Sequence, residues 1–326
     1  MAAEVPAQEA GHRWLLCICW LSAAALYTLC SASSEFLNSV FVTQYRFSYP
    51  AFIALCQALL TAIVLQLLRR ARLLEIQPYL LENGEIILIP SICFSFHSVL
   101  TLWAVASSNS TVFTFIKRFT PLANLALMET FNLKKRTPSS SAFLVLLVTL
   151  CSTLAGLQDF NDEAVVYVYG LLNVTFESTY LTLIQKICED HKKSVVDIYY
   201  TCTINSCPLL FVYCILHPDT PQIFPSGSWT SLIFLGFFSL VLVLGCLLNF
   251  LICLCTLRSS ALTMSMIEVA KTDILTLRNI VTSEWIFSPP PFLTSLFISA
   301  SGVGIYIYKE SRETKTSRKE AKGIPI

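Results

Sequence analysis

The sequence predicts an all-α polytopic membrane protein, with about ten transmembrane helices arranged as two inverted five-helix repeats. The first observation is composition: 55% of the residues are hydrophobic, 13% are charged and the mean hydropathy is +0.65, whereas soluble domains carry about 25% charged residues. The second is that the apolar residues form long runs, close to the ~20 residues that cross the hydrocarbon of a bilayer. The third is that Lys and Arg are concentrated in every second one of the polar breaks that separate these runs.

Ten apolar runs follow one another, each separated from the next by a polar or turn-rich segment. Helices and closed barrels are the structures that satisfy backbone hydrogen bonds in lipid, and these runs are too long and too uniformly apolar for barrel strands. The first run follows Arg13 without a small-residue cleavage site, so we expect a retained signal anchor. Helices are predicted at residues 14–32, 51–68, 87–106, 111–131, 141–157, 164–185, 195–216, 229–253, 260–282 and 290–308.

The positions of Lys and Arg set the predicted orientation. Of the 22 Lys and Arg residues, 17 fall in the two tails and in alternate breaks, and only Arg46 falls in the opposite breaks. Because cytosolic loops are enriched in basic residues, both termini are predicted to be cytosolic. Tails at residues 1–13 and 309–326 would then flank a ten-span domain at 14–308. The other four basic residues lie inside predicted spans, at Lys117, Arg118, Lys271 and Arg278.

Ten spans divide into halves of five at about residues 14–157 and 164–308. Five is an odd number, so the second half is inverted relative to the first. Inverted repeats are typical of secondary transporters, whose substrate site lies near mid-membrane where the halves meet. The four intramembrane basic residues all lie in the fourth span of a half, at 111–131 and 260–282.

Buried basic residues indicate a binding pathway. Each one costs about 2.5–3.5 kcal/mol at the bilayer centre, so such residues usually face a cavity. Two facing cations suit a phosphate dianion. Lys117 and Arg118 are about 100° apart on a helix, so one of them is expected to face the cavity. Snorkelling or internal pairing is the alternative for both, and it is the favoured interpretation for Arg278.

Carboxylates in the same spans leave other interpretations open. Glu268 lies three residues before Lys271 on the same helix face, so these two could form an ion pair. Glu177 in the sixth span could line the cavity or relay protons, and ordinary packing is an equal alternative. An empty cavity with unpaired cations would resist reorientation through lipid. This charge favours exchange of one anion for another over free uniport.

Short motifs along most of the chain, from about Ser34 to Tyr308, carry a family resemblance. Among them are Leu37-Asn-Ser, Phe115-Ile-Lys-Arg-Phe119, Tyr180-Leu-Thr-Leu-Ile-Gln-Lys186 and Gly245-Cys-Leu-Leu-Asn-Phe250. In order and spacing they resemble the nucleotide-sugar transporters of solute carrier family 35, subfamily D, within the drug/metabolite transporter superfamily.

This resemblance implies an inverted ten-helix antiporter in the Golgi or endoplasmic-reticulum membrane, with an endosomal vesicle membrane left open. Its substrates would be a cytosolic nucleotide sugar such as a UDP-sugar and a luminal nucleoside monophosphate. The family's phosphate-binding positions match Lys117 or Arg118 together with Lys271, and its nucleotide-binding stretch matches Tyr199 and Tyr200. The resemblance also places Thr201, Asn38, Glu268 and Thr272 in the site.

Several residues depart from the family pattern. Ser39 stands where the family usually has Lys, Thr201 replaces Asn, and Glu268 replaces a Gly in a segment that ends at Asp273. Glu268 adds negative charge near the expected phosphates, and Asp273 adds another unless it faces a basic partner. A non-transporting membrane scaffold or regulator derived from such a carrier therefore remains the alternative.

No enzymatic function is indicated. The sequence has no paired-carboxylate or nucleophile motif, and its 13 Cys and four His have no metal-ligand spacing. We therefore expect no cofactor and no metal site. The expected partners are the two nucleotides and the lipid bilayer, without nucleic acid, and both a monomer and a homodimer stay open.

Overall fold

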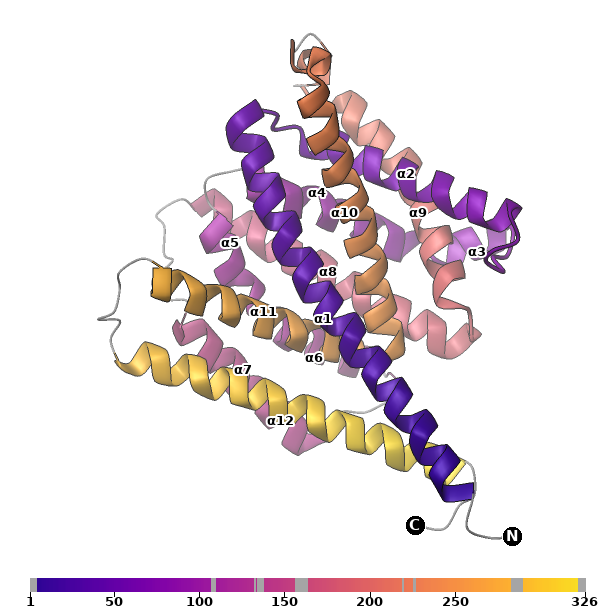
Figure 1. Ribbon diagram of the computed structural model, residues 1–326, viewed down its shortest axis with the longest axis vertical. Helices are drawn as coiled ribbons and strands as arrows, with labels where there is room; N and C mark the ends of the chain where they lie inside the picture. The colour runs from indigo at the N-terminus through magenta and orange to yellow at the C-terminus, as the bar shows by residue number, and fades with distance from the viewer. Residues whose placement is uncertain are drawn as a thin grey trace. The chain divides into compact units, whose positions relative to one another are not determined.

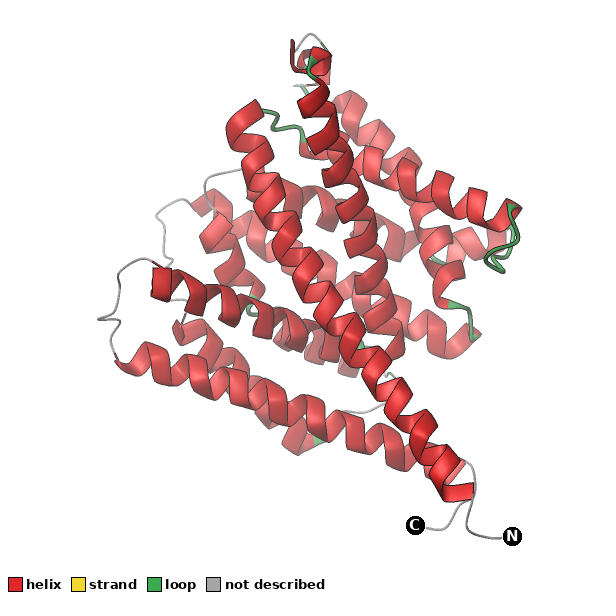
Figure 2. Cartoon of the chain, in the orientation of Figure 1, coloured by secondary structure: helices red, strands yellow, loops and turns green. Residues whose placement is uncertain are grey.

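The computed structural model of the chain describes residues 5–106, 110–131, 133, 138–155, 164–218, 220–224, 227–282 and 290–321. Regular structure in these ranges is helical, with no strand among them (Figure 2). Within the described residues, four segments are long and apolar enough to cross a membrane: Pro50–Arg70, Val195–Leu216, Leu232–Arg258 and Phe292–Glu310. These observations confirm the all-α polytopic membrane class. The number of ten spans and their inverted repeat stay predictions.

Two compact units make up the chain. Unit 1 comprises Met1–Ser108 and Leu183–Ser260, and unit 2 comprises Asn109–Thr182 and Ala261–Ile326. Each unit takes residues from both predicted halves, and the division at 14–157 and 164–308 stays a prediction. The basic residues 134–136 and the acidic segment 158–163 lie outside the described residues.

The helices of unit 1 are labelled in Figure 1. They are α1 (Val5–Tyr45), α2 (Pro50–Arg70), α3 (Leu81–Ile86), α4 (Leu88–Ala106), α9 (Val195–Leu216) and α10 (Leu232–Arg258). Two short 3₁₀ turns, which the figure does not label, are η2 (Thr220–Gln222) and η3 (Gly227–Thr230). The predicted bounds 195–216 match those of α9, whereas α1 is longer than the predicted 14–32. Helix α8 (Ala164–His191) begins in unit 2 and ends in unit 1.

The start of α9 is set by local hydrogen bonds. Lys192 adopts a left-handed φ of 49°, which ends the preceding helix. The Ser194 hydroxyl then caps α9 by accepting from the backbone N–H two residues further on. Lys193 Nζ donates to Asn83 Oδ1 at 2.6 Å. Burial lowers the pKa of the Lys193 ammonium, and the neighbouring Asp197 carboxylate opposes that shift.

Unit 1 packs around an aromatic cluster and one close helix approach. Phe41, Phe47 and Phe234 are at most 1% exposed and contact one another, with ring centroids 5.2–5.5 Å apart. Helices α2 and α10 approach closely at Gly245, because a Cβ there would lie 2.0 Å from the amide nitrogen of Gln57. That amide donates to the Val241 carbonyl at 3.3 Å.

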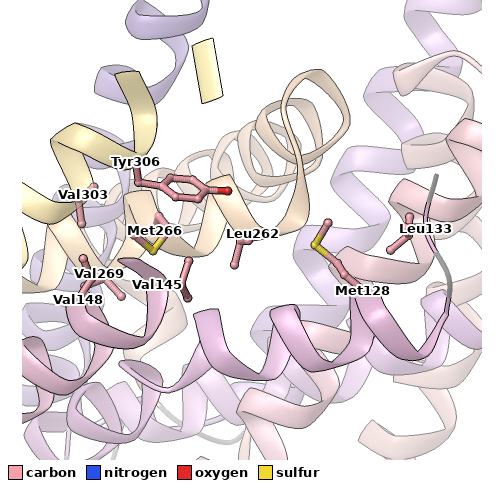
Figure 3. Packing of buried hydrophobic residues seen from close by; sticks show 9 residues of the cluster. All are labelled: Met128, Leu133, Val145, Val148, Leu262, Met266, Val269, Val303 and Tyr306. Carbon is pink, nitrogen blue, oxygen red and sulfur yellow. The ribbon is translucent and has the colours of Figure 1, made fainter. Parts of the chain in front are cut away.

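Unit 2 packs around a second hydrophobic cluster, shown in Figure 3. Its helices are α5 (Ser110–Lys117), α6 (Thr120–Thr130), α7 (Ser139–Ala155), the first part of α8, α11 (Ala261–Thr282) and α12 (Pro290–Ala321). Val145 of α7, Met266 of α11 and Tyr306 of α12 are among the cluster's buried side chains. Burying a side chain of this kind contributes about 1.5–3 kcal/mol relative to leaving it exposed.

The predicted span at 111–131 is two helices, α5 and α6, separated at Arg118 and Phe119. The break follows from Pro121, which lacks the N–H that would bond the Lys117 carbonyl and whose ring clashes with that carbonyl. The backbone closes the turn with tighter bonds, from the N–H of Arg118 to the Phe115 carbonyl at 3.2 Å and from Phe119 to Ile116 at 3.0 Å. Expecting one continuous helix here was therefore wrong.

Candidate functional site

Lys117 lies in the last turn of α5, where the unpaired carbonyls of the helix end favour a cation. Its Nζ donates to Glu268 Oε1 of α11 at 2.8 Å. The same nitrogen lies 3.4 Å from Glu177 Oε2 of α8. Three helices of unit 2 thus bring one ammonium group and two carboxyl groups together.

A second lysine completes this group. Glu177 and Glu268 both lie beside Lys117 Nζ, and Lys271, one turn further along α11, interacts electrostatically with Glu268. Glu177, Glu268 and Lys271 are 3%, 4% and 6% exposed, so these charges are largely removed from solvent. We call Lys117, Glu177, Glu268 and Lys271 the lysine cluster. Its two ammonium and two carboxyl groups balance in charge when all four are ionised.

Arg118, the next residue, lies in a different group. Its Nη1 donates to the Ser152 carbonyl and hydroxyl, each at 2.6 Å, and to Asp273 Oδ1 at 3.0 Å. Its Nη2 donates to Thr276 Oγ1 at 2.7 Å. Asp273 in turn accepts from the hydroxyls of Ser152 at 2.7 Å and Ser299 at 2.5 Å. We call these five residues the arginine cluster.

The structure separates residues that the sequence could not tell apart. Lys117 belongs to the lysine cluster and Arg118 to the arginine cluster, so internal pairing, the alternative for both, is what the structure contains. Thr272 is buried beside Lys271, and its hydroxyl donates to the Val269 carbonyl at 2.8 Å. Arg278 is exposed on α11. A role for any of these residues in substrate binding stays a prediction.

The remaining predicted site residues lie in unit 1. Asn38 is buried in α1, where its amide donates to Ser34 Oγ at 3.2 Å. Tyr200 OH accepts from Arg69 Nη1 at 3.4 Å. Thr201 is 5% exposed. Burial of Asn38 and Thr201 in a membrane helix bundle fits packing as well as ligand binding.

Tyr199 lies beside a small polar cavity in unit 1. Its hydroxyl donates to the Cys246 carbonyl at 3.2 Å, and its ring meets Phe250 edge to face. The cavity measures about 10 Å³, which is about the room that one water molecule needs. It is far too small for a nucleotide in this conformation. Its other polar lining comes from Gln57, Thr61, Ser98, Thr203 and Asn249.

Three contributors to the arginine cluster were not found from the sequence. Ser152, Thr276 and Ser299 are hydroxyl residues within apolar runs, and such residues give no signal of a distant partner. Asp273 was named with a basic partner as one alternative, and its ion pair with Arg118 agrees with that alternative. Among the described residues, no group of three or more His, Cys, Asp or Glu side chains could hold a metal ion.

Comparisons with known proteins bear on the class of transporter. The chain is 27% identical to "UDP-galactose/UDP-glucose transporter 7" of Arabidopsis thaliana, over 90% of this chain and 91% of that protein. It is 22% identical to "UDP-sugar transporter sqv-7" of Caenorhabditis elegans, over 90% of each chain. No family model matches.

A solved structure shares the fold. A protein crystal structure that is 14% identical in sequence covers 87% of this chain and 97% of its own, with a TM-score of 0.59. At that identity the likeness concerns the fold alone. The two curated relatives are transporters and not enzymes, which agrees with the interpretation that this chain is not an enzyme. They also confirm the resemblance to the nucleotide-sugar transporter family.

Proposed function

We propose that this relative of the UDP-sugar transporters moves a nucleotide sugar from the cytosol into the lumen of the Golgi or endoplasmic reticulum. A nucleoside monophosphate would leave in exchange. The observation that carries the proposal is the lysine cluster, in which the partly buried Lys117 and the buried Lys271 lie in a membrane helix bundle beside carboxylates. Buried charges of this kind usually mark a substrate pathway.

Lys117 is the better candidate for a phosphate contact than Arg118. An ammonium group binds phosphate as a point charge, and the carboxylates around Lys117 are anionic oxygens that phosphate oxygens can replace. The guanidinium of Arg118 already donates to Ser152, Asp273 and Thr276. A substrate would have to break all of these bonds to gain access to it.

The helix break also supports this assignment. Transporter sites often use discontinuous helices, whose ends present partial charges to the substrate. The break between α5 and α6 lies directly beside Lys117. The distribution of Lys and Arg along the sequence supports cytosolic termini, and the family resemblance supports the choice of endomembrane.

A second function is favoured by one specific observation. Lys117 and Arg118 form ion pairs with residues of their own unit, as in a membrane protein that no longer binds an anion. A non-transporting scaffold or regulator would retain such pairs. Nucleotide binding distinguishes the two functions, because a ligand that binds only the folded state raises stability by ~2.7 kcal/mol at a hundredfold excess over Kd.

Exchange in proteoliposomes tests the proposal. Vesicles loaded with a nucleoside monophosphate are mixed with a panel of labelled UDP-, GDP- and CMP-sugars, and uptake is measured. Lys117→Gln and Lys271→Ala should each lower exchange ~10-fold or more, since a charged hydrogen bond contributes about 1.5–3 kcal/mol. The exposed Lys192→Gln variant is the matched control. If no compound in the panel exchanges and none raises the unfolding temperature, the scaffold function is supported instead.

A further inference from the structure

Glu268 occupies the place at Lys117 that a substrate phosphate would need. Its Oε1 accepts from Lys117 Nζ at 2.8 Å, a direct contact between a buried carboxylate and a partly buried ammonium group. The α11 helix therefore delivers its own anion directly to this ammonium group.

Carboxylate and phosphate compete for the same donor. Both present anionic oxygens that bind an ammonium group at about 2.7–2.9 Å. While Glu268 is seated on Lys117, a phosphate oxygen cannot take the same position. Substrate binding at Lys117 must therefore displace a carboxylate that is held at high local concentration by its own helix.

The charges of the lysine and arginine clusters balance without a ligand. In the lysine cluster, the positive charges of Lys117 and Lys271 are matched by the negative charges of Glu177 and Glu268. In the arginine cluster, the charge of Arg118 is matched by that of Asp273. Among the other charged side chains described on the helices of unit 2, Glu129 on α6 and Arg278 on α11 are exposed, and Lys309 and Glu310 on α12 are partly exposed. A buried cation whose partner is removed is strongly disfavoured. The pairs in this structure avoid that cost when no substrate is bound.

We propose that Glu268, assisted by Glu177, is a tethered counter-anion that replaces the substrate phosphate on Lys117 whenever the carrier is empty. The empty carrier can then reorient, so this chain also moves nucleotide sugar without a nucleotide on the far side. The inference rests on the proposed transport function and refines it: exchange is one mode of the carrier and is not obligatory. The expectation that exchange is favoured over uniport depends on unpaired cations, and in this structure the cations are paired with carboxylates.

Two measurable consequences separate this role from a purely structural one. First, uptake into vesicles without internal nucleotide should be detectable for the wild type. Second, because Glu268 competes with the substrate, Glu268→Gln should lower the KM for exchange several-fold while it abolishes uptake into empty vesicles. A variant that only folded poorly would lower both activities together and leave the KM unchanged.

The experiment compares two sets of proteoliposomes made from one preparation, one empty and one loaded with uridine monophosphate. Uptake of a labelled UDP-sugar is measured in both, and the ratio of empty to loaded uptake is independent of the amount of folded protein. The wild type should give a ratio within about tenfold of unity, and Glu268→Gln should lower that ratio at least tenfold. Glu268→Asp keeps the charge and should restore the ratio.

Two further variants complete the test. Glu177→Gln should lower the ratio less than Glu268→Gln, because Glu177 lies 3.4 Å from the lysine nitrogen against 2.8 Å for Glu268. The exposed Glu129→Gln variant makes the same chemical change outside the cluster and should leave the ratio unchanged.

Exchange in loaded vesicles with no uptake into empty ones would overturn the inference and leave the proposed function intact. An unaltered ratio in Glu268→Gln would also overturn it. No uptake of any labelled nucleotide sugar in either set would reject the proposed function, and the inference with it.

Discussion

Lys117 and Arg118 are adjacent in the chain, yet their surroundings differ in kind. Lys117 contacts two carboxylates on two other helices, and both partners are flexible charged side chains. Arg118 is 1% exposed and is bound by a carbonyl, two hydroxyls and a carboxylate. The break between α5 and α6 allows neighbouring residues to point into separate groups. A cation paired with carboxylates can exchange them for another anion, whereas one bound to backbone and hydroxyls holds helices together.

Removal of Arg118 should have the largest effect on folding. Arg118→Ala leaves the Asp273 carboxylate buried without its cation, and breaking a buried pair in this way costs about 3–5 kcal/mol. We expect this variant to lose most of its monodisperse protein in detergent and to unfold at a much lower temperature. Fluorescence-detected size exclusion and thermal unfolding measure both properties.

A double variant sharpens this prediction. Arg118→Met combined with Asp273→Leu removes both charges and should be more stable than Arg118→Ala, because replacing a buried pair by apolar side chains is often neutral or stabilising. If the double variant unfolds at the same temperature as Arg118→Ala, the ion pair is not what stabilises this region.

Lys117→Gln should show the opposite pattern, with a smaller loss of stability and a large loss of exchange. The glutamine amide can still donate to Glu268, so the packing between α5 and α11 is kept. A phosphate loses a charged donor, which corresponds to ~10-fold or more in exchange. The ratio of exchange rate to folded protein measures this effect. Full exchange in Lys117→Gln would assign the phosphate contact elsewhere.

The approach of α8 to α5 should be sensitive to Gly170. A Cβ at this position would lie 2.4 Å from Cδ1 and 3.2 Å from Cβ of Ile116, one residue before Lys117. Gly170→Val should therefore destabilise the protein by about 1–3 kcal/mol through overpacking. It should also weaken the contact between Lys117 and Glu177.

A matched glycine gives the control for that variant. A Cβ at Gly304 of α12 would meet no neighbouring side chain or helix within 4 Å among the described residues, so Gly304→Ala should stabilise the helix by about 0.8–1 kcal/mol. Thermal unfolding of the two variants should therefore shift in opposite directions. If the unfolding temperatures of both variants shifted in the same direction, helix propensity and not the close approach to Ile116 would explain the effect of Gly170→Val.

Ser299→Ala is expected to give the smallest effect. It removes one of the hydrogen bonds to Asp273 and should cost about 1 kcal/mol, because Arg118 and Ser152 still satisfy the carboxylate. Exchange should be unchanged once it is scaled to folded protein. A loss of exchange without a loss of stability would place the arginine cluster in substrate binding.

The sequence predicted the elements of this fold better than their contacts. Hydrophobic runs and capping residues are local, so the helical membrane class and the bounds of α9 could be read directly. The break at Arg118 could also have been predicted, because Pro121 lies four residues after Lys117 and removes the hydrogen bond that a continuous helix needs.

The ion pairs could not be predicted in the same way. Lys117 and Glu268 are 151 residues apart, and Arg118 and Asp273 are 155 apart. Spacing within one helix suggested Lys271 as a partner of Glu268, and the two do interact, but it gave no signal of Lys117. Periodicity shows which residues share a helix face and leaves open which distant helix lies opposite, so tertiary contacts decide the partners.

Titration calorimetry with uridine monophosphate tests most directly whether a phosphate replaces the Glu268 carboxylate on Lys117. Purified wild type, Lys117→Gln and Glu268→Gln are compared in the same detergent and salt. The account predicts that Lys117→Gln raises the Kd ~10-fold or more and that Glu268→Gln lowers it several-fold. Equal Kd values for all three proteins would contradict it.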